Sequence, residues 1–152
     1  MARISVIIPS YNHEKFIGEA ISSILDQTYQ DFELIVVDNY SNYDFFALIE
    51  SFKNGKIIPL QNRNNGIIAI NRNFGIKHAQ GEYIAFLDSD LDYHPQALAW
   101  FLKIIKEKDA DLVIGNRNDK KSTFHYPFVR KIASKGFNIY TNLLFPKLEV
   151  ED

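Results

Sequence analysis

Residues 83–90 read Tyr83-Ile84-Ala85-Phe86-Leu87-Asp88-Ser89-Asp90, an apolar run that ends in an acidic cluster. A short apolar run bounded by polar residues predicts a buried strand over Tyr83–Leu87. In an extended segment, residues i and i+2 project to the same side, so the carboxylates of Asp88 and Asp90 can converge on one cation. The run therefore predicts a strand of a covered sheet with an acidic site at its carboxyl end.

Similar apolar runs occur before and after this one, and they predict further strands at Ile4–Ile8, Phe32–Val37, Lys56–Leu60 and Leu112–Ile114. Apolar residues at helical spacing lie between these runs. They are Ile17, Ala20, Ile21, Ile24 and Leu25, then Ile67, Ile70 and Phe74, and later Leu98, Phe101, Leu102 and Ile105. Pro95 suits the first turn of the last helix. The alternation predicts an α/β fold, a mostly parallel, Rossmann-like sheet flanked by helices, in a single domain over residues 1–152.

Composition narrows the class of protein further. The chain has 152 residues, 46% of them hydrophobic, which suffices for one well-packed core. Its formal net charge of −2 disfavours a nucleic-acid partner, and the absence of cysteine excludes disulfides and suits a reducing compartment. No apolar run approaches the roughly 20 residues that cross a bilayer, and the first residues lack a signal-peptide pattern. We expect a cytoplasmic protein, either soluble or peripheral at the inner face of a membrane.

Polar residues follow the predicted strands, where doubly wound sheets bind their ligands. Pro9-Ser10-Tyr11-Asn12 follows the first strand, and Asp38-Asn39 follows the second. Neither segment is glycine-rich, and both the G-x-G-x-x-G and P-loop patterns are missing, which disfavours dinucleotide dehydrogenases and P-loop NTPases. A pyrophosphate at this edge would need another counter-charge. A divalent cation held by carboxylates supplies one.

Each charged candidate also has a purely structural explanation. An Asp-x-Asp pair is often a solvated turn or a helix cap, but its position after an apolar strand favours a metal site for Asp88 and Asp90. Asp92 is either a third oxygen ligand or a helix-start residue. Asp38 either binds a base or ribose or caps the next turn, and Arg72 either contacts phosphate or pairs with a strand-end carboxylate. The histidines lack metal-ligand spacing and are interpreted as surface residues: His13, His78, His94 and His125.

Together these segments resemble family 2 glycosyltransferases of the GT-A fold. The resemblance covers essentially the whole chain in the family's order, and it is carried by residues 4–12, 21–29, 32–38, 65–66, 72–75 and 81–90. It implies a metal-dependent hexosyltransferase that uses a UDP- or GDP-linked sugar and Mg²⁺ or Mn²⁺. Asp88, Asp90 and Asp92 would hold the metal, and Asp88 and Asp90 would be the catalytic carboxylates.

The resemblance also implies a donor site. Its residues would be Pro9, Ser10, Tyr11, Asn12, Asp38, Asn65, Arg72, Asp88 and Ser89. Asp38 and the turn at residues 9–11 would hold the base and ribose, while the metal would neutralise charge on the departing nucleoside diphosphate. One departure concerns the loop after the second strand, where the family usually has Asp-Asp-Gly-Ser. This chain has Asp38-Asn39-Tyr40-Ser41, without the glycine and with one carboxylate fewer.

The second half resembles the polyprenyl-phosphate glycosyltransferases, a branch that includes dolichyl-phosphate mannosyltransferase. Residues 88–95 are similar to its acidic loop, and residues 111–117 to a strand that carries an acceptor-phosphate arginine. By this resemblance Arg117, Arg130 and Ser134 would bind the acceptor phosphate, since guanidinium forks match phosphate oxygens. An ordinary solvated helix face is the alternative for Arg130 and Ser134. We expect sugar transfer to a polyprenyl or dolichyl phosphate at a membrane surface.

The chain ends at Asp152, whereas family members continue into an acceptor-side section. We therefore expect a form truncated after the acceptor-phosphate helix. Two other functions stay open: transfer to a saccharide in cell-surface polysaccharide synthesis, and donor binding without turnover. Apolar surface left exposed by the missing section leads us to expect a homodimer.

Overall fold

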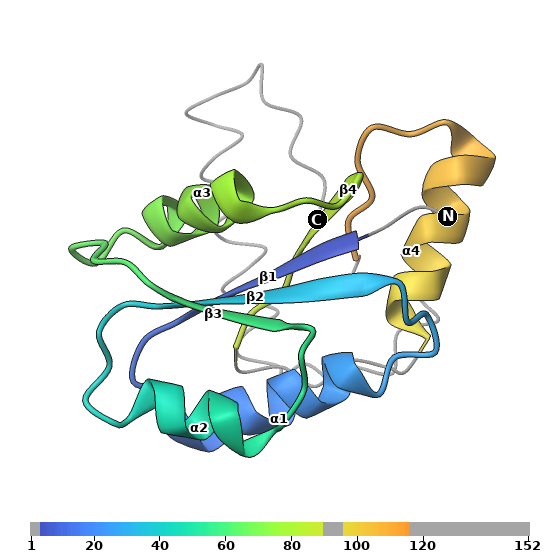
Figure 1. Ribbon diagram of the computed structural model, residues 1–152. Coiled ribbons are helices and arrows are strands. Elements are labelled where there is room, and N and C mark those ends of the chain that lie inside the picture. Colours follow the sequence, from blue (N-terminus) through green and yellow to red (C-terminus); the bar gives the residue numbers. More distant parts are fainter. Residues whose placement is uncertain (1–3, 90–95, 116–152) are drawn as a thin grey trace, which may run out of the picture. The chain divides into compact units, whose positions relative to one another are not determined.

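Figure 1 shows a computed structural model of the chain, which describes residues 4–89 and 96–115. The elements follow in the order β1 (Ile4–Ser10), α1 (Glu14–Leu25), β2 (Phe32–Asp38), α2 (Phe45–Ser51), β3 (Ile57–Gln61), α3 (Ile68–His78), β4 (Tyr83–Phe86) and α4 (Ala97–Lys108). The chain divides into two compact units, residues 1–110 and 111–152, and all of these elements belong to the first. No helix in the described ranges combines the length and the apolar character needed to span a membrane.

The strands form one parallel sheet in the order β3-β2-β1-β4, which confirms the predicted α/β class and parallel arrangement. The register aligns Ser10 of β1 with Asp38 of β2, and Asp38 with Gln61 of β3. The carboxyl ends of these three strands therefore lie at the same level. The loops that follow them share one edge of the sheet.

Helices cover both faces of the sheet, with α1 and α2 on one face and α3 on the other (Figure 1). Successive side chains of a strand point to opposite faces, so each central strand contributes to two cores. Ile4, Val6 and Ile8 of β1 belong to the larger cluster, which also contains the buried hydrophobic residues of α1 and α2. Ile7 belongs to the smaller cluster, against which Phe74 of α3 packs. The mainly apolar sequences of β1 and β2 reflect this burial on both sides.

The start of α4 is fixed by a buried glutamine. Gln27 follows α1 and is 1% exposed. Its Nε2 donates to the carbonyl of Ser23 at 3.0 Å, and its Oε1 accepts from the backbone N–H of Leu98 at 3.1 Å. The first N–H groups of a helix have no partner within the helix, so this side chain satisfies one of them. Leu98 and Leu102 then complete the larger cluster.

Two sequence predictions need correction. Residues 111–115 contain no strand, although Leu112–Ile114 was expected to form one, because three apolar residues are a weak signal without a paired neighbour. The strand β4 is not fully buried: Ile84 is 39% and Phe86 45% exposed, and β1 is its only partner among the described strands. The structure begins α4 at Ala97, and Pro95, which was expected in its first turn, lies outside the described residues.

Candidate functional site

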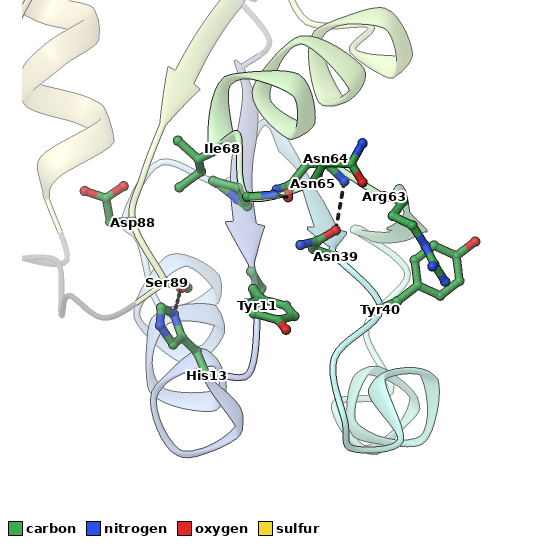
Figure 2. A pocket seen from close by; sticks show the side chains of 13 residues that line it. Tyr11, His13, Asn39, Tyr40, Arg63, Asn64, Asn65, Ile68, Asp88 and Ser89 are labelled. Atoms are coloured by element: carbon green, nitrogen blue, oxygen red, sulfur yellow. Dashed lines mark hydrogen bonds between the residues drawn. The ribbon is translucent and has the colours of Figure 1, made fainter.

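A pocket of about 720 Å³ lies at the carboxyl edge of the sheet. All four strand ends contribute to its lining, as Figure 2 shows. Its residues are Pro9, Ser10, Tyr11, His13, Asn39, Tyr40, Arg63, Asn64, Asn65, Gly66, Ile68, Asp88 and Ser89. The pocket is thus located where ligands of parallel α/β sheets bind.

Most of the predicted donor-binding residues line this pocket. Those that do are Pro9, Ser10, Tyr11, Asn65, Asp88 and Ser89. Tyr11 is 53% exposed and occupies the middle of the view in Figure 2, between the loops from β2 and β4. The hydroxyl of Ser10 is buried and has no hydrogen-bond partner within the described residues. A buried polar atom without a partner is costly, so this hydroxyl favours a site completed by a ligand or water.

Asp38 and Asn12, also predicted to bind the donor, do not line the pocket but hold its loops together. Asp38 is fully buried. One of its oxygens accepts from the backbone N–H of Ser41 at 2.9 Å and from Gln61 at 3.0 Å, and the other accepts from the Ser41 hydroxyl. Asn12 joins the loop after β1 to the loop after β2, since its N–H donates to Ser41 and its side chain accepts from Asn42. Asp38 therefore caps the turn that follows it, the structural alternative raised by the sequence.

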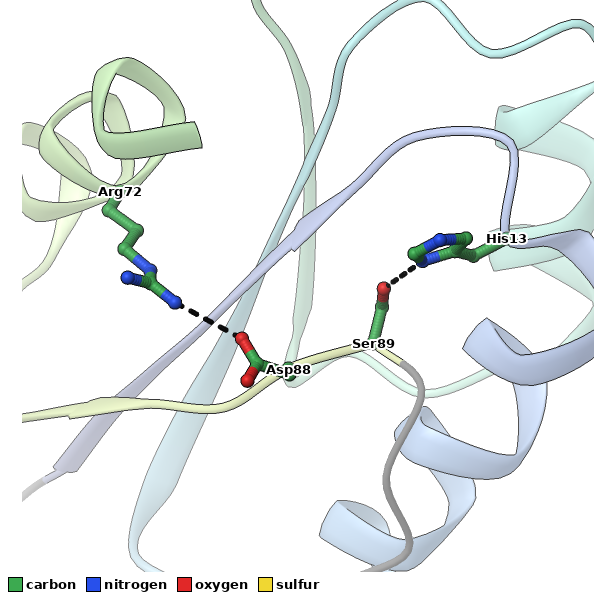
Figure 3. Close-up of polar contacts among 4 residues, drawn as sticks. All are labelled: His13, Arg72, Asp88 and Ser89. Atoms are coloured by element: carbon green, nitrogen blue, oxygen red, sulfur yellow. Dashed lines mark hydrogen bonds and ion pairs between the residues drawn. The ribbon is translucent and has the colours of Figure 1, made fainter. Parts of the chain in front are cut away.

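Arg72 approaches the pocket from α3 and pairs with Asp88, as Figure 3 shows. Its Nη2 lies 3.1 Å from Oδ1 of Asp88, with the two side chains 37% and 47% exposed. The guanidinium carbon also lies 5.8 Å from the ring of Phe86. Of the two roles considered for Arg72, the structure has the pairing with a strand-end carboxylate. The pair orients Asp88 at the rim of the pocket.

His13 contributes to the pocket in a way that the sequence did not indicate. Its side chain is exposed, as expected for a surface histidine, but it lines the pocket and its Nδ1 lies 2.5 Å from the hydroxyl of Ser89 (Figures 2 and 3). This contact joins the segment before α1 to the segment after β4. It therefore holds Ser89, and with it the segment that carries Asp88, against the segment before α1.

Several other lining residues were missed: Asn39, Tyr40, Arg63, Asn64, Gly66 and Ile68. They come from the loops after β2 and β3 and from the start of α3. The available signal was the strand-end rule, which applies to β3 as well as to the strands that end in aspartate. The predicted site was centred on the strand-end carboxylates, and the amide and guanidinium groups of these loops were given no role in it.

The loops around the pocket repeatedly adopt left-handed backbone conformations. Asn12 and Tyr40 have φ of 54°, Asn65 has φ of 50°, and Gly66 has φ of 83°. Glycine and asparagine tolerate this region, whereas an aromatic residue there is uncommon and strained. Tyr40 stands where the resembled family has glycine, and it takes a conformation that suits glycine. Strained residues of this kind cluster at binding sites, which fits the location of the pocket.

The metal and acceptor predictions are tested only in part. Among the pocket-lining residues Asp88 is the one carboxylate, and the described ranges contain no cluster of three or more metal-binding side chains. Asp90, Asp92, Arg117, Arg130 and Ser134 lie outside the described residues. Metal binding by the acidic loop and phosphate binding by the second half therefore stay predictions.

Comparison with known proteins supports the resemblance seen in the sequence. The model of the family described as "Glycosyl transferase family 2" matches residues 5–149. The poly(ribitol-phosphate) beta-N-acetylglucosaminyltransferase TarP of Staphylococcus aureus is 37% identical over 119 residues, which are 76% of this chain and 36% of TarP. The UDP-Glc:alpha-D-GlcNAc-diphosphoundecaprenol beta-1,3-glucosyltransferase WfgD of Escherichia coli is 35% identical over 113 residues, 74% of this chain and 45% of WfgD. The chain spans less than half the length of either relative.

Solved structures agree. S. aureus TarS 1-349 in complex with UDP-GlcNAc matches with a TM-score of 0.64 and 27% identity, over 78% of this chain and 38% of that one. The mannosyltransferase PcManGT from Pyrobaculum calidifontis, in complex with GDP-Man and Mn²⁺, matches with a TM-score of 0.63 and 25% identity, over 68% and 32%. These likenesses confirm the expected GT-A fold. They do not show that the chain belongs to the polyprenyl-phosphate branch. The relatives named above are instead described by a poly(ribitol phosphate) and by a diphosphoundecaprenol-linked sugar.

Proposed function

This chain belongs to glycosyl transferase family 2, and from that premise we propose that it binds a nucleoside-diphosphate sugar in the strand-end pocket and transfers the sugar to an acceptor. The observation that carries the proposal is the pocket itself. It combines a half-exposed aromatic ring, Tyr11, with a carboxylate, Asp88, at the edge where α/β sheets bind nucleotides. Solved relatives hold UDP-GlcNAc and GDP-Man, which supports a nucleotide-sugar donor.

We assign the two ends of the donor from the chemistry of the lining. The ring of Tyr11 offers a stacking surface for a flat base, and the amides of Asn39 and Asn64 offer hydrogen bonds. Asp88 and Ser89 stand at the other side, after β4. A diphosphate next to a carboxylate is favoured only if a cation lies between them, so this is the diphosphate end. In this arrangement Asp38 supports the base end through Ser41 instead of touching the base.

We further propose Mg²⁺ or Mn²⁺ as the cation. Asp88 fits a hard cation, since it presents a carboxylate at the pocket. Asp90 and Asp92 would complete the ligand set. When bound, the metal would neutralise charge on the departing diphosphate. Arg72 orients Asp88, His13 holds Ser89, and we propose a carboxylate of the acidic loop as the base that takes the acceptor proton.

For the acceptor we propose a hydroxyl of a glycan or polyol. The relatives support this choice, since one is named for a poly(ribitol phosphate) and another for a sugar on diphosphoundecaprenol. A polyprenyl or dolichyl phosphate at a membrane surface is the second candidate, which rests on the resemblance around Arg117, Arg130 and Ser134. Undiminished transfer to polyprenyl phosphate by Arg117→Ala and Arg130→Ala would exclude a role of these arginines in binding the acceptor phosphate. A parallel assay with glycan acceptors separates the two.

Thermal shift with UDP- and GDP-sugars, each with and without Mn²⁺, tests the donor assignment. We expect one nucleotide to raise the melting temperature only when Mn²⁺ is present. Asp88→Asn should abolish that shift, whereas Asp109→Asn should keep it, because Asp109 lies at the end of α4 and its left-handed backbone suits asparagine. Equal shifts in Asp88→Asn and wild type would contradict the metal site. Binding without turnover would instead support a donor-binding domain.

Self-association is a further proposal. Large apolar side chains are exposed on α3 and β4, among them Ile68, Ile76 and Phe86. Exposed apolar side chains on consecutive elements are often covered by another chain or by another part of the same chain. We expect a homodimer in light scattering. A monomeric mass across a concentration series would contradict it.

A further inference from the structure

An arginine and a tyrosine form a stacked pair at one end of the pocket. Arg63 follows β3 and Tyr40 follows β2, and the guanidinium carbon lies 4.9 Å from the centre of the tyrosine ring. Both residues line the pocket, where Figure 2 shows them side by side. No carboxylate of the described residues pairs with Arg63. The stack therefore restrains the guanidinium without using its N–H groups.

The sheet order places this pair far from Asp88. The strands run β3-β2-β1-β4, so the loop that carries Arg63 and the loop that carries Asp88 are separated by three strand spacings. At ~4.8 Å per spacing this is about 14 Å. Tyr11, at the end of β1, lies between them. An extended nucleoside diphosphate with its phosphates at Asp88 and its base stacked on Tyr11 therefore directs the far edge of the base towards the loops after β2 and β3.

The polar groups at this end are mainly hydrogen-bond donors. Arg63 has five N–H donors and no acceptor. The side-chain oxygen of Asn39 accepts from the backbone N–H of Asn64 at 2.9 Å, and that of Asn64 accepts from Gly66 at 2.9 Å. The amide nitrogens of Asn39 and Asn64 donate to no group of the described residues. The amide oxygens of these two side chains thus face the backbone, while their N–H groups are available to a ligand.

The position of Tyr40 also indicates a role beyond closing a turn. The tyrosine holds a φ of 54°, a left-handed conformation that is unfavourable for a bulky residue relative to a relaxed backbone. Glycine would avoid this cost at the same place. The ring is 51% exposed, so burial of the side chain does not explain its presence. The contact that the ring makes is with Arg63, whose guanidinium group lies over its face.

We propose that Arg63, restrained by Tyr40, selects the nucleobase of the donor and favours bases that present a carbonyl oxygen over bases that present an amino group. Uracil and guanine offer an acceptor where cytosine and adenine offer a donor. A donor-lined end matches the first pair and opposes the second. The inference rests on the proposed nucleotide-sugar function and names the base class for that site.

Calorimetric titration of the full chain with UDP and CDP, and with GDP and ADP, in the presence of Mn²⁺, tests the proposal. Within each pair the two ligands share charge and phosphates, so the ratio of their dissociation constants reports the base edge. We expect the wild type to prefer UDP over CDP, or GDP over ADP, by about tenfold or more. Arg63→Ala should reduce that ratio to near one. Arg63→Lys should lower it partly, because lysine lacks the planar fork.

Variants of Tyr40 separate the effect of the aromatic ring on base selection from its effect on the backbone of the loop. Tyr40→Gly suits the left-handed backbone but removes the ring, so the ratio should fall while the urea midpoint stays at or above that of wild type. Tyr40→Phe keeps the ring and should keep the ratio. Asp88→Asn should weaken both ligands of a pair equally and leave the ratio intact.

The outcomes distinguish base selection by Arg63 from nucleotide binding by the pocket. A wild type without preference within both pairs, or an unchanged ratio in Arg63→Ala, overturns the assignment of Arg63 and leaves the donor site standing. A folded wild type that binds none of the four nucleotides overturns the proposed function, and the base selection with it. Far-UV circular dichroism of each variant confirms that the protein compared is folded.

Discussion

The contact between α3 and β1 offers a sharp test of how the fold positions Arg72. Gly75 lies in α3, on the face that covers the sheet. A methyl group added at Gly75 would lie 2.6 Å from Cγ2 of Ile7 and 3.4 Å from two further atoms of the same side chain. Ile7 is fully buried in β1, between two neighbouring strands. We therefore expect Gly75→Ala to force α3 away from the sheet.

Two opposing terms decide the magnitude. Alanine is better than glycine inside a helix by about 1 kcal/mol. Carbon atoms pack best at 3.5–4.0 Å, so the new contact is short by roughly 1 Å, and overpacking of this kind costs about 1–3 kcal/mol. Because the clash is with a buried branched side chain, we take the upper end. The net result is a destabilisation of about 2 kcal/mol, or a fall in melting temperature of roughly 4–8 °C for a chain of this size.

The control is a second helical glycine. In Gly18→Ala the new methyl group of α1 meets only Cζ of Phe52, at 4.0 Å, which is an ordinary contact. The same helix-propensity gain applies there without a clash, so Gly18→Ala should be stabilised by up to about 1 kcal/mol. Urea denaturation of both variants measures the two free energies. The prediction is that they have opposite signs.

A double-mutant cycle with Ile7→Ala identifies the cause. Ile7→Ala alone should cost about 2–5 kcal/mol through the cavity it leaves. In the presence of Gly75→Ala that cavity is partly filled and the clash is removed, so the double variant should lose less than the sum of the single losses. Strict additivity, or a Gly75→Ala protein as stable as Gly18→Ala, would refute the close packing of α3 on β1.

Further predictions concern buried hydrogen bonds and the pair at the pocket. Gln27→Ala should lower the free energy of unfolding by about 2–4 kcal/mol, because it leaves the N–H of Leu98 and the carbonyl of Ser23 without their partner; urea denaturation measures this. Asp38→Ala should cost about as much for the same reason, whereas a stability change below about 0.5 kcal/mol would contradict the capping role. Arg72→Ala should change stability by only about 0–1 kcal/mol, since the pair is partly exposed, yet calorimetry should show weaker Mn²⁺-dependent nucleotide binding.

The strands could be predicted because each is a compact apolar run, and parallel burial on both faces demands such runs. The helix α2 was missed because it has too few buried apolar residues to show a helical period. It has seven residues, and its buried side chains are Phe45 and Ile49, a single pair at helical spacing. One pair cannot establish a period, so the main local signal was Asp44, whose side chain accepts from the N–H of Ala47 as a helix cap. Capping alone does not distinguish a short helix from a turn.

The location of the site could also be predicted, but not its full membership. The rule that ligands bind at strand ends singled out Tyr11, Asp88 and Ser89, and all three line the pocket. The pairing of His13 with Ser89 joins residues 76 positions apart, and no local pattern announces such a contact. Arg63 and Tyr40 come together in the same way, through the neighbouring ends of β2 and β3. Contacts between loops depend on strand order, which the sequence left open.

Strand order also explains why two strand-end aspartates behave so differently. Asp38 ends β2, which lies between β1 and β3, so its carboxylate is surrounded by neighbouring loops and is fully buried. A buried carboxylate is tolerated only when its oxygens are hydrogen-bonded, and Ser41 and Gln61 provide those bonds. Asp88 follows β4, which has one neighbour among the described strands, and its side chain stays 47% exposed. The position of a strand in the sheet therefore decides which carboxylate supports the loops and which stays accessible to a ligand.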